Sequence, residues 1–178
     1  GYAYVPLSTA PGLWGAYADY MYLDPHSIVH PIRKDLPAGL AVMFNPLGAG
    51  FRWAVEIPQT QVGDTVLIFG PGQRGLASVV AAREAGAGKI IVTGLAADSN
   101  KLQMALALGA DHIIDVQNEN VVDRVRALTN GKGADVIVEV TSYATQPVRE
   151  ALDCVRMGGT VVLAGVKGFK PVSDFVSD

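Results

Sequence analysis

Three glycines at G-x-G-x-x-G spacing carry the clearest chemical signal in this sequence. Gly70, Gly72 and Gly75 follow the apolar run 66–69 and precede residues 76–84, which have a helical composition. In such a strand–turn–helix unit, the first glycine allows a sharp turn and the second allows backbone to approach a pyrophosphate. The third lets the helix pack close to the sheet. The spacing therefore predicts a dinucleotide-binding turn.

The predicted helix start is where the pyrophosphate would lie. Its unpaired N–H groups and the positive end of the helix dipole favour an anion there. Gln73 and Arg74 are expected to offer backbone N–H groups to the phosphates, and Arg74 to add a positive charge. A solvated arginine at a helix start is the alternative interpretation of Arg74.

The end of the second predicted strand, residues 89–93, bears on the form of the coenzyme. NAD sites usually have Asp or Glu at this point to hold the ribose hydroxyls, but here the position is Gly94. A missing carboxylate permits the 2′-phosphate of NADP, yet no arginine follows to bind it, and Lys101 is the first cation. Asp98 either bends back to the ribose or, more simply, caps the next helix. NAD and NADP both remain open.

The sequence offers few metal ligands. A catalytic zinc needs three ligands from Cys, His or carboxylates, and this chain has one cysteine, Cys154, and three histidines without paired spacing. His26 and His30 are four residues apart, but His26 follows the turn at 24–25, so surface or packing roles are expected for both. His112 is expected to be structural, and Cys154 to be a small buried hydrophobe. No metal site is predicted in this chain.

These candidate residues need a parallel sheet to bring them together. Short apolar runs alternate with segments of helical period, which predicts a doubly wound parallel α/β sheet with helices on both faces. The ligand crevice then lies at the carboxyl ends of the strands, where Gly70, Gly94, Thr141 and Gly165 fall. The expected strands are 66–69, 89–93, 112–116, 134–140 and 160–165, and the expected helices are 76–84, 98–109, 120–129 and 147–155.

The segment before this pattern is less regular. Residues 1–15 show no period and begin as though something preceded them. Residues 16–23 and 27–32 are predicted to be short strands. Residues 36–56 have a helical pattern that Asn45-Pro46 should divide into two helices or kink.

Composition excludes several classes of protein. The net charge of −3 over 178 residues gives no reason to expect binding to nucleic acid or to an anionic membrane. No apolar run is long enough to span a bilayer. A single cysteine excludes an internal disulfide and fits a reducing compartment. The expectation is a cytoplasmic domain.

Several ordered motifs make the sequence similar to the medium-chain, zinc-type alcohol dehydrogenase family. They are Val-Gly-Asp-Thr-Val-Leu-Ile-Phe-Gly-Pro-Gly (62–72), Ala-Leu-Gly-Ala-Asp-His-Ile-Ile-Asp (107–115), Gly-Lys-Gly-Ala-Asp-Val-Ile-Val-Glu-Val (131–140), Arg-Met-Gly-Gly-Thr-Val-Val-Leu-Ala-Gly (156–165) and, upstream, Gly-Ala-Tyr-Ala-Asp-Tyr-Met (15–21). The resemblance implies that residues 1–35 are a remnant of a catalytic, GroES-like domain. It also implies that residues 36–178 are a Rossmann domain lacking its last strand, so that the chain is a fragment.

The resemblance also assigns roles to individual residues. Lys101 matches a position near the adenosine ribose, with an exposed charge on the helix as the alternative. Asn45 occupies the place where the family often has its third zinc ligand, a Cys or an acidic residue. A neutral amide is a poor zinc ligand, which argues against a catalytic zinc even in the intact protein. The alternative interpretation of Asn45 is a helix-breaking residue before Pro46. Residues at the ends of the fourth and fifth strands would line the nicotinamide half of the coenzyme, with ordinary turn chemistry as the alternative: Val140, Thr141, Ala164, Gly165 and Val166.

The implied function is hydride transfer between NAD or NADP and a small alcohol or carbonyl substrate, by an intact enzyme expected to be a homo-oligomer. The fragment alone should be inactive. A zinc-independent reductase of the quinone or enoyl type is the first alternative, and Asn45 is its main support. A non-catalytic nucleotide-binding module is the second.

Overall fold

The chain forms two compact units, residues 1–38 and 39–178. The structure is a computed structural model that describes residues 5–168. Within residues 5–37 there is no helix or strand, so the predicted strands 16–23 and 27–32 are wrong. Aromatic and β-branched residues suggested strands, but Tyr17, Tyr20 and Ile28 are exposed, and a strand is stable only when a neighbouring strand pairs with its N–H and C=O groups.

Three short helices open the second unit. They are α1 (Ala38–Ala41), α2 (Phe44–Phe51) and η2, a π-helix over Arg52–Glu56. The predicted interruption exists, but it lies at residues 42–43 rather than at Asn45-Pro46. Pro46 falls in the first turn of α2, where its missing N–H leaves no intrahelical bond unmade. Gly50 of α2 packs on α3, because a Cβ there would lie 2.6 Å from the carbonyl carbon of Ala77.

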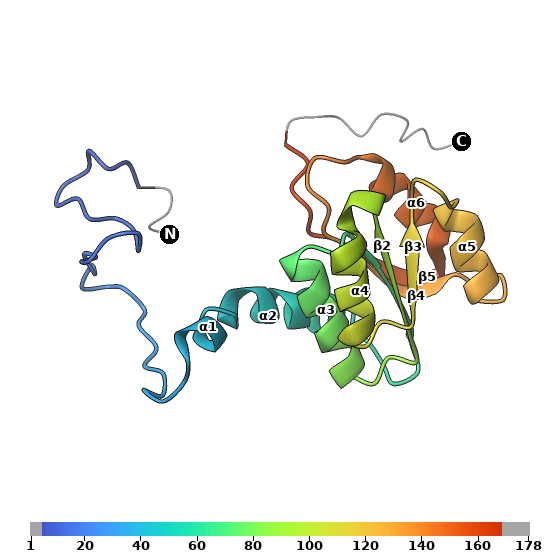
Figure 1. Cartoon of the computed structure of the whole chain (residues 1–178), viewed down its shortest axis with the longest axis horizontal. Coiled ribbons are helices and arrows are strands. Elements are labelled where there is room, and N and C mark those ends of the chain that lie inside the picture. The colour runs from blue at the N-terminus through green and yellow to red at the C-terminus, as the bar shows by residue number, and fades with distance from the viewer. Residues whose placement is uncertain (1–4, 169–178) are drawn as a thin grey trace. The chain divides into compact units, whose positions relative to one another are not determined.

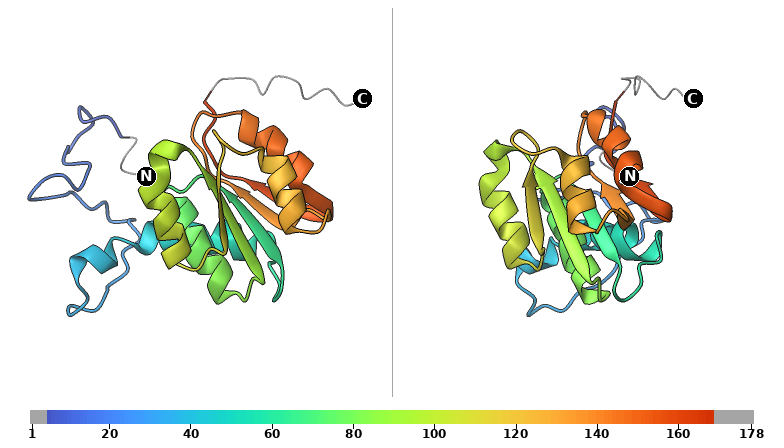
Figure 2. Two further views of the ribbon diagram at one scale, coloured as in Figure 1. Left: turned by 45° about the vertical axis from the view of Figure 1, so that its right-hand side comes forward. Right: turned by 90° about the vertical axis from the view of Figure 1, so that its right-hand side faces the viewer.

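The centre of the second unit is a five-stranded parallel sheet in the order β3-β2-β1-β4-β5. Its strands are β1 (Thr65–Phe69), β2 (Lys89–Gly94), β3 (His112–Asp115), β4 (Ala134–Glu139) and β5 (Val155–Leu163). The helices between them are α3 (Gln73–Glu84), α4 (Ser99–Ala107, preceded by a 3₁₀ turn over Ala96–Asp98), α5 (Val121–Leu128) and α6 (Gln146–Cys154). Figures 1 and 2 show these helices covering both faces of the sheet. The predicted doubly wound fold is confirmed.

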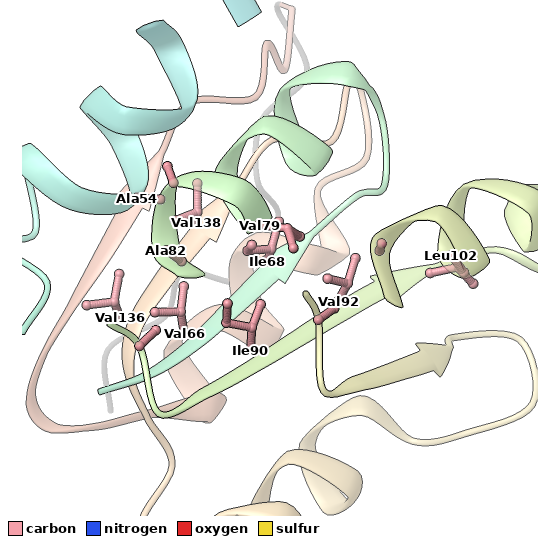
Figure 3. Close-up of a cluster of buried hydrophobic side chains, with 14 residues drawn as sticks. Ala54, Val66, Ile68, Val79, Ala82, Ile90, Val92, Leu102, Val136 and Val138 are labelled. Carbon is pink, nitrogen blue, oxygen red and sulfur yellow. The ribbon is translucent and has the colours of Figure 1, made fainter. Parts of the chain in front are cut away.

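Alternate residues of the central strands supply two separate cores. Val66 and Ile68 of β1 face the layer of α3 and α4 and belong to the same cluster of buried side chains as Val79 and Leu102 (Figure 3). Leu67 and Phe69 face the opposite layer of α5 and α6, and Cys154 is fully buried there, as predicted. A strand covered on both faces has no polar side to expose, which explains why its sequence is continuously apolar.

Both ends of the fifth strand differ from what the sequence indicates, whereas the end of the first helix after the glycine turn agrees. The fifth strand begins at Val155, five residues before the predicted start, because the chain joins β4 early through an irregular register near Gly158 and Gly159. It ends at Leu163, so Ala164 and Gly165 follow the strand. The helix α3 ends at Glu84, as predicted, and Gly86 follows it in the left-handed region at φ 86°. Of the helices in residues 5–168, none is long and apolar enough to cross a membrane.

Candidate nucleotide-binding site

A pocket of about 440 Å³ lies at the carboxyl ends of β1, β2 and β4. It therefore occupies the edge of the sheet at which the crevice was predicted, where the chain order reverses between β1 and β4. Six of the predicted site residues line it: Gly70, Gly72, Gly94, Lys101, Val140 and Thr141. The other six, Gln73, Arg74, Gly75, Ala164, Gly165 and Val166, are outside its lining.

The glycine turn forms one wall of the pocket. Gly70 has φ 100°, a conformation that side chains disfavour, and its N–H donates to the carbonyl of Thr93 at 3.1 Å. Gly75 is buried against the same turn: a Cβ on Gly75 would stand 1.9 Å from the Gly70 carbonyl oxygen. Gly72 differs from both, since a Cβ there would meet no protein atom within 4 Å. The protein itself demands glycine at 70 and 75, whereas at 72 it leaves open space facing the pocket.

The amino terminus of α3 adjoins that space. Gly72 is its N-cap residue in extended conformation, and no side chain caps the helix. The first N–H groups of α3, including those of Gln73 and Arg74, thus have no capping side chain, and uncapped N–H groups at a helix start can bind an anion. The guanidinium carbon of Arg74 lies 5.6 Å from the centre of the Trp53 ring, in a cation–π contact. Its charge is therefore directed onto η2 and does not line the pocket.

The end of β2 forms the opposite wall. A Cβ on Gly94 would lie 2.9 Å from Pro71 Cγ and 3.1 Å from Leu102 Cδ2. Glycine at this position thus has a packing reason, independent of which coenzyme binds. Asp98 does not cap α4 with its side chain, contrary to the simpler prediction. It accepts a hydrogen bond from Lys101 Nζ at 2.6 Å, and both side chains line the pocket.

The residues after β4 and β5 are joined by backbone hydrogen bonds. The N–H groups of Ala164 and Gly165 both donate to the carbonyl of Glu139 at 2.9 Å, and Tyr143 N–H donates to the carbonyl of Val166 at 2.8 Å. Tyr143, for which the sequence offered no role, is exposed with φ 63°. The residues after β5 that were predicted to line the nicotinamide half are therefore bonded to Glu139 and Tyr143 and are outside the pocket lining.

Sequence reasoning missed two residues beside the pocket, Glu139 and Lys167. The Glu139 side chain is fully buried, and Lys167 Nζ lies 2.8 Å from its carboxylate; the lysine side chain is 15% exposed. One signal was available for Glu139: it is the single charged residue in the otherwise apolar run 136–140. Charged residues are seldom fully buried unless they are paired.

Metal ligands do not gather in the part of the chain that the structure describes. Within residues 5–168, no three His, Cys, Asp or Glu side chains are placed to hold a metal ion. His26 and His30 are exposed, and His26 Nδ1 contacts Asp24 Oδ1 at 3.1 Å. Asn45 is exposed in the first turn of α2.

Comparison with known proteins decides the family. The sequence model described as zinc-binding dehydrogenase matches residues 75–177, more than half of the chain. The chain belongs to the zinc-binding dehydrogenase family. The predicted family membership is thus confirmed.

Two curated relatives show the range of enzymes that the chain is similar to. A probable alcohol dehydrogenase from Mycobacterium tuberculosis is 47% identical over 170 residues, which are 94% of this chain and 46% of that protein. An L-threonine 3-dehydrogenase from Rhizobium rhizogenes is 31% identical over 152 residues, 85% of this chain and 42% of that protein. The chain spans about half the length of the curated relatives it matches.

Solved structures of alcohol dehydrogenases have the same fold. An alcohol dehydrogenase from Thermotoga maritima superposes with a TM-score of 0.81 at 32% identity, over 93% of this chain and 46% of that one. An alcohol dehydrogenase from Thermus sp. ATN1 gives a TM-score of 0.69 at 30% identity, over 76% of this chain and 39% of that one.

Proposed function

We propose that this chain is the coenzyme-binding part of an alcohol dehydrogenase-like oxidoreductase, which transfers hydride between NAD or NADP and a small alcohol or carbonyl compound. One observation carries the proposal: the turn from Gly70 to Gly75 opens onto a pocket at the carboxyl ends of β1, β2 and β4. The space beside Gly72 and the uncapped start of α3 fit a pyrophosphate. Residues 1–35 would then be the remnant of a catalytic domain.

The residues of this chain would bind and orient the coenzyme. Backbone N–H groups at Gln73 and Arg74 would hold the pyrophosphate, and Lys101 with Asp98 would contact the adenosine ribose. Val140 and Thr141 would form the wall beside the nicotinamide. When bound, the nicotinamide ring supplies the carbon that donates or accepts hydride. Groups that polarise the substrate oxygen are expected outside this chain.

A zinc-independent reductase of the quinone or enoyl type is the second candidate. Asn45 favours it, since an amide stands where the resemblance places a zinc ligand. Because the described residues gather no set of metal ligands, no catalytic step is assigned to zinc here. Zinc analysis of the full-length protein separates the two candidates: one tightly held ion required for activity would exclude the zinc-independent reductase.

Calorimetric titration of the chain with NADH and with NADPH tests the proposal. We expect saturable binding of at least one of them with a stoichiometry of one, and no alcohol-dependent reduction of NAD or NADP by the chain alone. Failure to bind either nucleotide would contradict the proposal. Binding without any alcohol or carbonyl turnover in the full-length protein would favour a non-catalytic nucleotide-binding module instead.

A further inference from the structure

Glu139, at the end of β4, makes hydrogen bonds that connect the residues beside the pocket. Its backbone carbonyl accepts from the N–H groups of Ala164 and Gly165, both at 2.9 Å. Its side-chain Oε1 accepts from Thr141 N–H at 2.9 Å, from the Thr141 hydroxyl and from Lys167 Nζ at 2.8 Å. One fully buried residue therefore joins the segment after β4 to the segment after β5.

Lys167 completes this network from the other side. Its Nζ donates to the Thr141 carbonyl at 2.7 Å and to the Thr141 hydroxyl at 3.0 Å, besides its bond to Glu139. All three ammonium protons thus have acceptors within residues 139–141. Glu139 Oε2 is 2.8 Å from Nζ but accepts no hydrogen bond within the described residues. Oε2 instead lies against Gly165, whose added Cβ would be only 2.8 Å away.

The network fixes Thr141 against the glycine turn. A Cβ on Gly70 would lie 3.0 Å from Thr141 Cγ2, so these two walls of the pocket are in contact. A shift of Thr141 would therefore move the pocket lining beside Gly70 as well. To orient a bound reactant, the groups that contact it must stay within about 1 Å of their positions.

Stability alone is a weak reason for a buried ion pair. Removing two charges from water costs free energy that their attraction often only balances, and apolar residues of similar volume frequently serve as well. The pair also lies at the edge of the sheet that bears the pocket: Thr141 lines the pocket, whereas the buried Glu139 and the largely buried Lys167 are outside its lining.

We propose that Glu139 and Lys167 are positioning residues, which hold Thr141 and the β5 exit in the arrangement that receives the nicotinamide half of the coenzyme. The inference rests on the proposed function and adds to it two residues that touch no coenzyme atom themselves. It requires that loosening the pair affects nicotinamide-bearing ligands and spares ligands that carry only the adenosine diphosphate half.

The test compares Lys167→Met with the neutral double variant Glu139→Gln/Lys167→Met. Calorimetry measures the dissociation constants of ADP and of whichever of NADH and NADPH the unmodified chain binds more tightly. We expect both variants to bind the dinucleotide about tenfold more weakly and ADP unchanged. The double variant leaves no unpaired buried charge, so it decides the question if Lys167→Met does not fold.

Arg156→Met is the matched control. Arg156 pairs with Asp135 and links the same two strands, β4 and β5, at their opposite end. It should lower the melting temperature and leave both dissociation constants unchanged. Unchanged dinucleotide affinity in the double variant, or equal weakening of dinucleotide and ADP, would overturn the positioning role while leaving the proposed function intact. If the unmodified chain binds no dinucleotide, both proposals fail together.

Discussion

Gly75 stands so close to Gly70 that a Cβ on Gly75 would come within 1.9 Å of the Gly70 carbonyl oxygen. The two ends of the glycine turn are therefore in van der Waals contact, and α3 starts directly above the end of β1. Gly72, between them, touches no protein atom at the position of a Cβ. One motif thus contains glycines required for two different reasons.

Gly75→Ala and Gly72→Ala should separate these reasons. We expect Gly75→Ala to lower the free energy of unfolding by about 3 kcal/mol, because backbone must move to admit the methyl group. Gly72→Ala should change stability by less than about 0.5 kcal/mol but weaken dinucleotide binding. Urea denaturation and calorimetric titration of each variant provide the measurements. A stable Gly75→Ala variant would contradict this close packing of Gly75 against Gly70.

The pair of Asp98 and Lys101 should govern the choice of coenzyme. Asp98→Asn removes a negative charge from the pocket and weakens the 2.6 Å contact with Lys101. We expect NADPH affinity to rise relative to NADH by about fivefold, equivalent to about 1 kcal/mol. Lys101→Met should weaken both. Dissociation constants measured at fixed ionic strength provide the check.

Glu56→Gln is the control for that pair. It breaks the exposed contact between Arg52 and Glu56, which is outside the pocket lining. It removes one negative charge just as Asp98→Asn does, so a general electrostatic effect would appear in both variants. An equal shift in NADPH affinity would therefore exclude a specific role for Asp98.

Asp135 should make the fold sensitive to acid. Burial alone would raise the pKa of its carboxyl, but hydrogen bonds from Thr65 N–H and Arg156 outweigh burial and hold the pKa below the ordinary 3.8. A carboxyl with a lowered folded pKa contributes stability above its unfolded pKa and loses it as the pH falls through the folded value. Asp135→Asn should therefore be less stable at pH 7, and its stability should depend less on pH below about pH 4. Denaturation midpoints of both proteins across this range would show parallel curves if Asp135 had no such role.

The thiol of Cys154 should be unreactive in the folded chain. Burial, followed by the nearby charges of Glu150 and Asp153, raises the pKa of its thiol to about 12. The thiolate is the reactive form, so a disulfide reagent at pH 8 should modify Cys154 only after unfolding. The absorbance change with and without urea measures this. Rapid modification of the native chain would show that α6 opens readily.

The sequence by itself determined those features of this protein that depend on residues close together along the chain. The apolar runs, the helical periods and the three glycines act within a few residues of one another, and they were enough to predict the doubly wound sheet and the edge at which the pocket lies. They misled at residues 16–32, because composition does not show whether a strand has a partner to pair with.

Only the tertiary structure decided how the charged residues are used. Lys167 meets Glu139 across 28 residues of chain and the Thr141 carbonyl across 26, and Arg74 turns to Trp53 of a preceding helix. Such contacts follow from which strands lie side by side and where each one ends. The local sequence pattern determines neither the order of the strands nor where each one ends. A buried charge is stable only when the fold brings its partner to it.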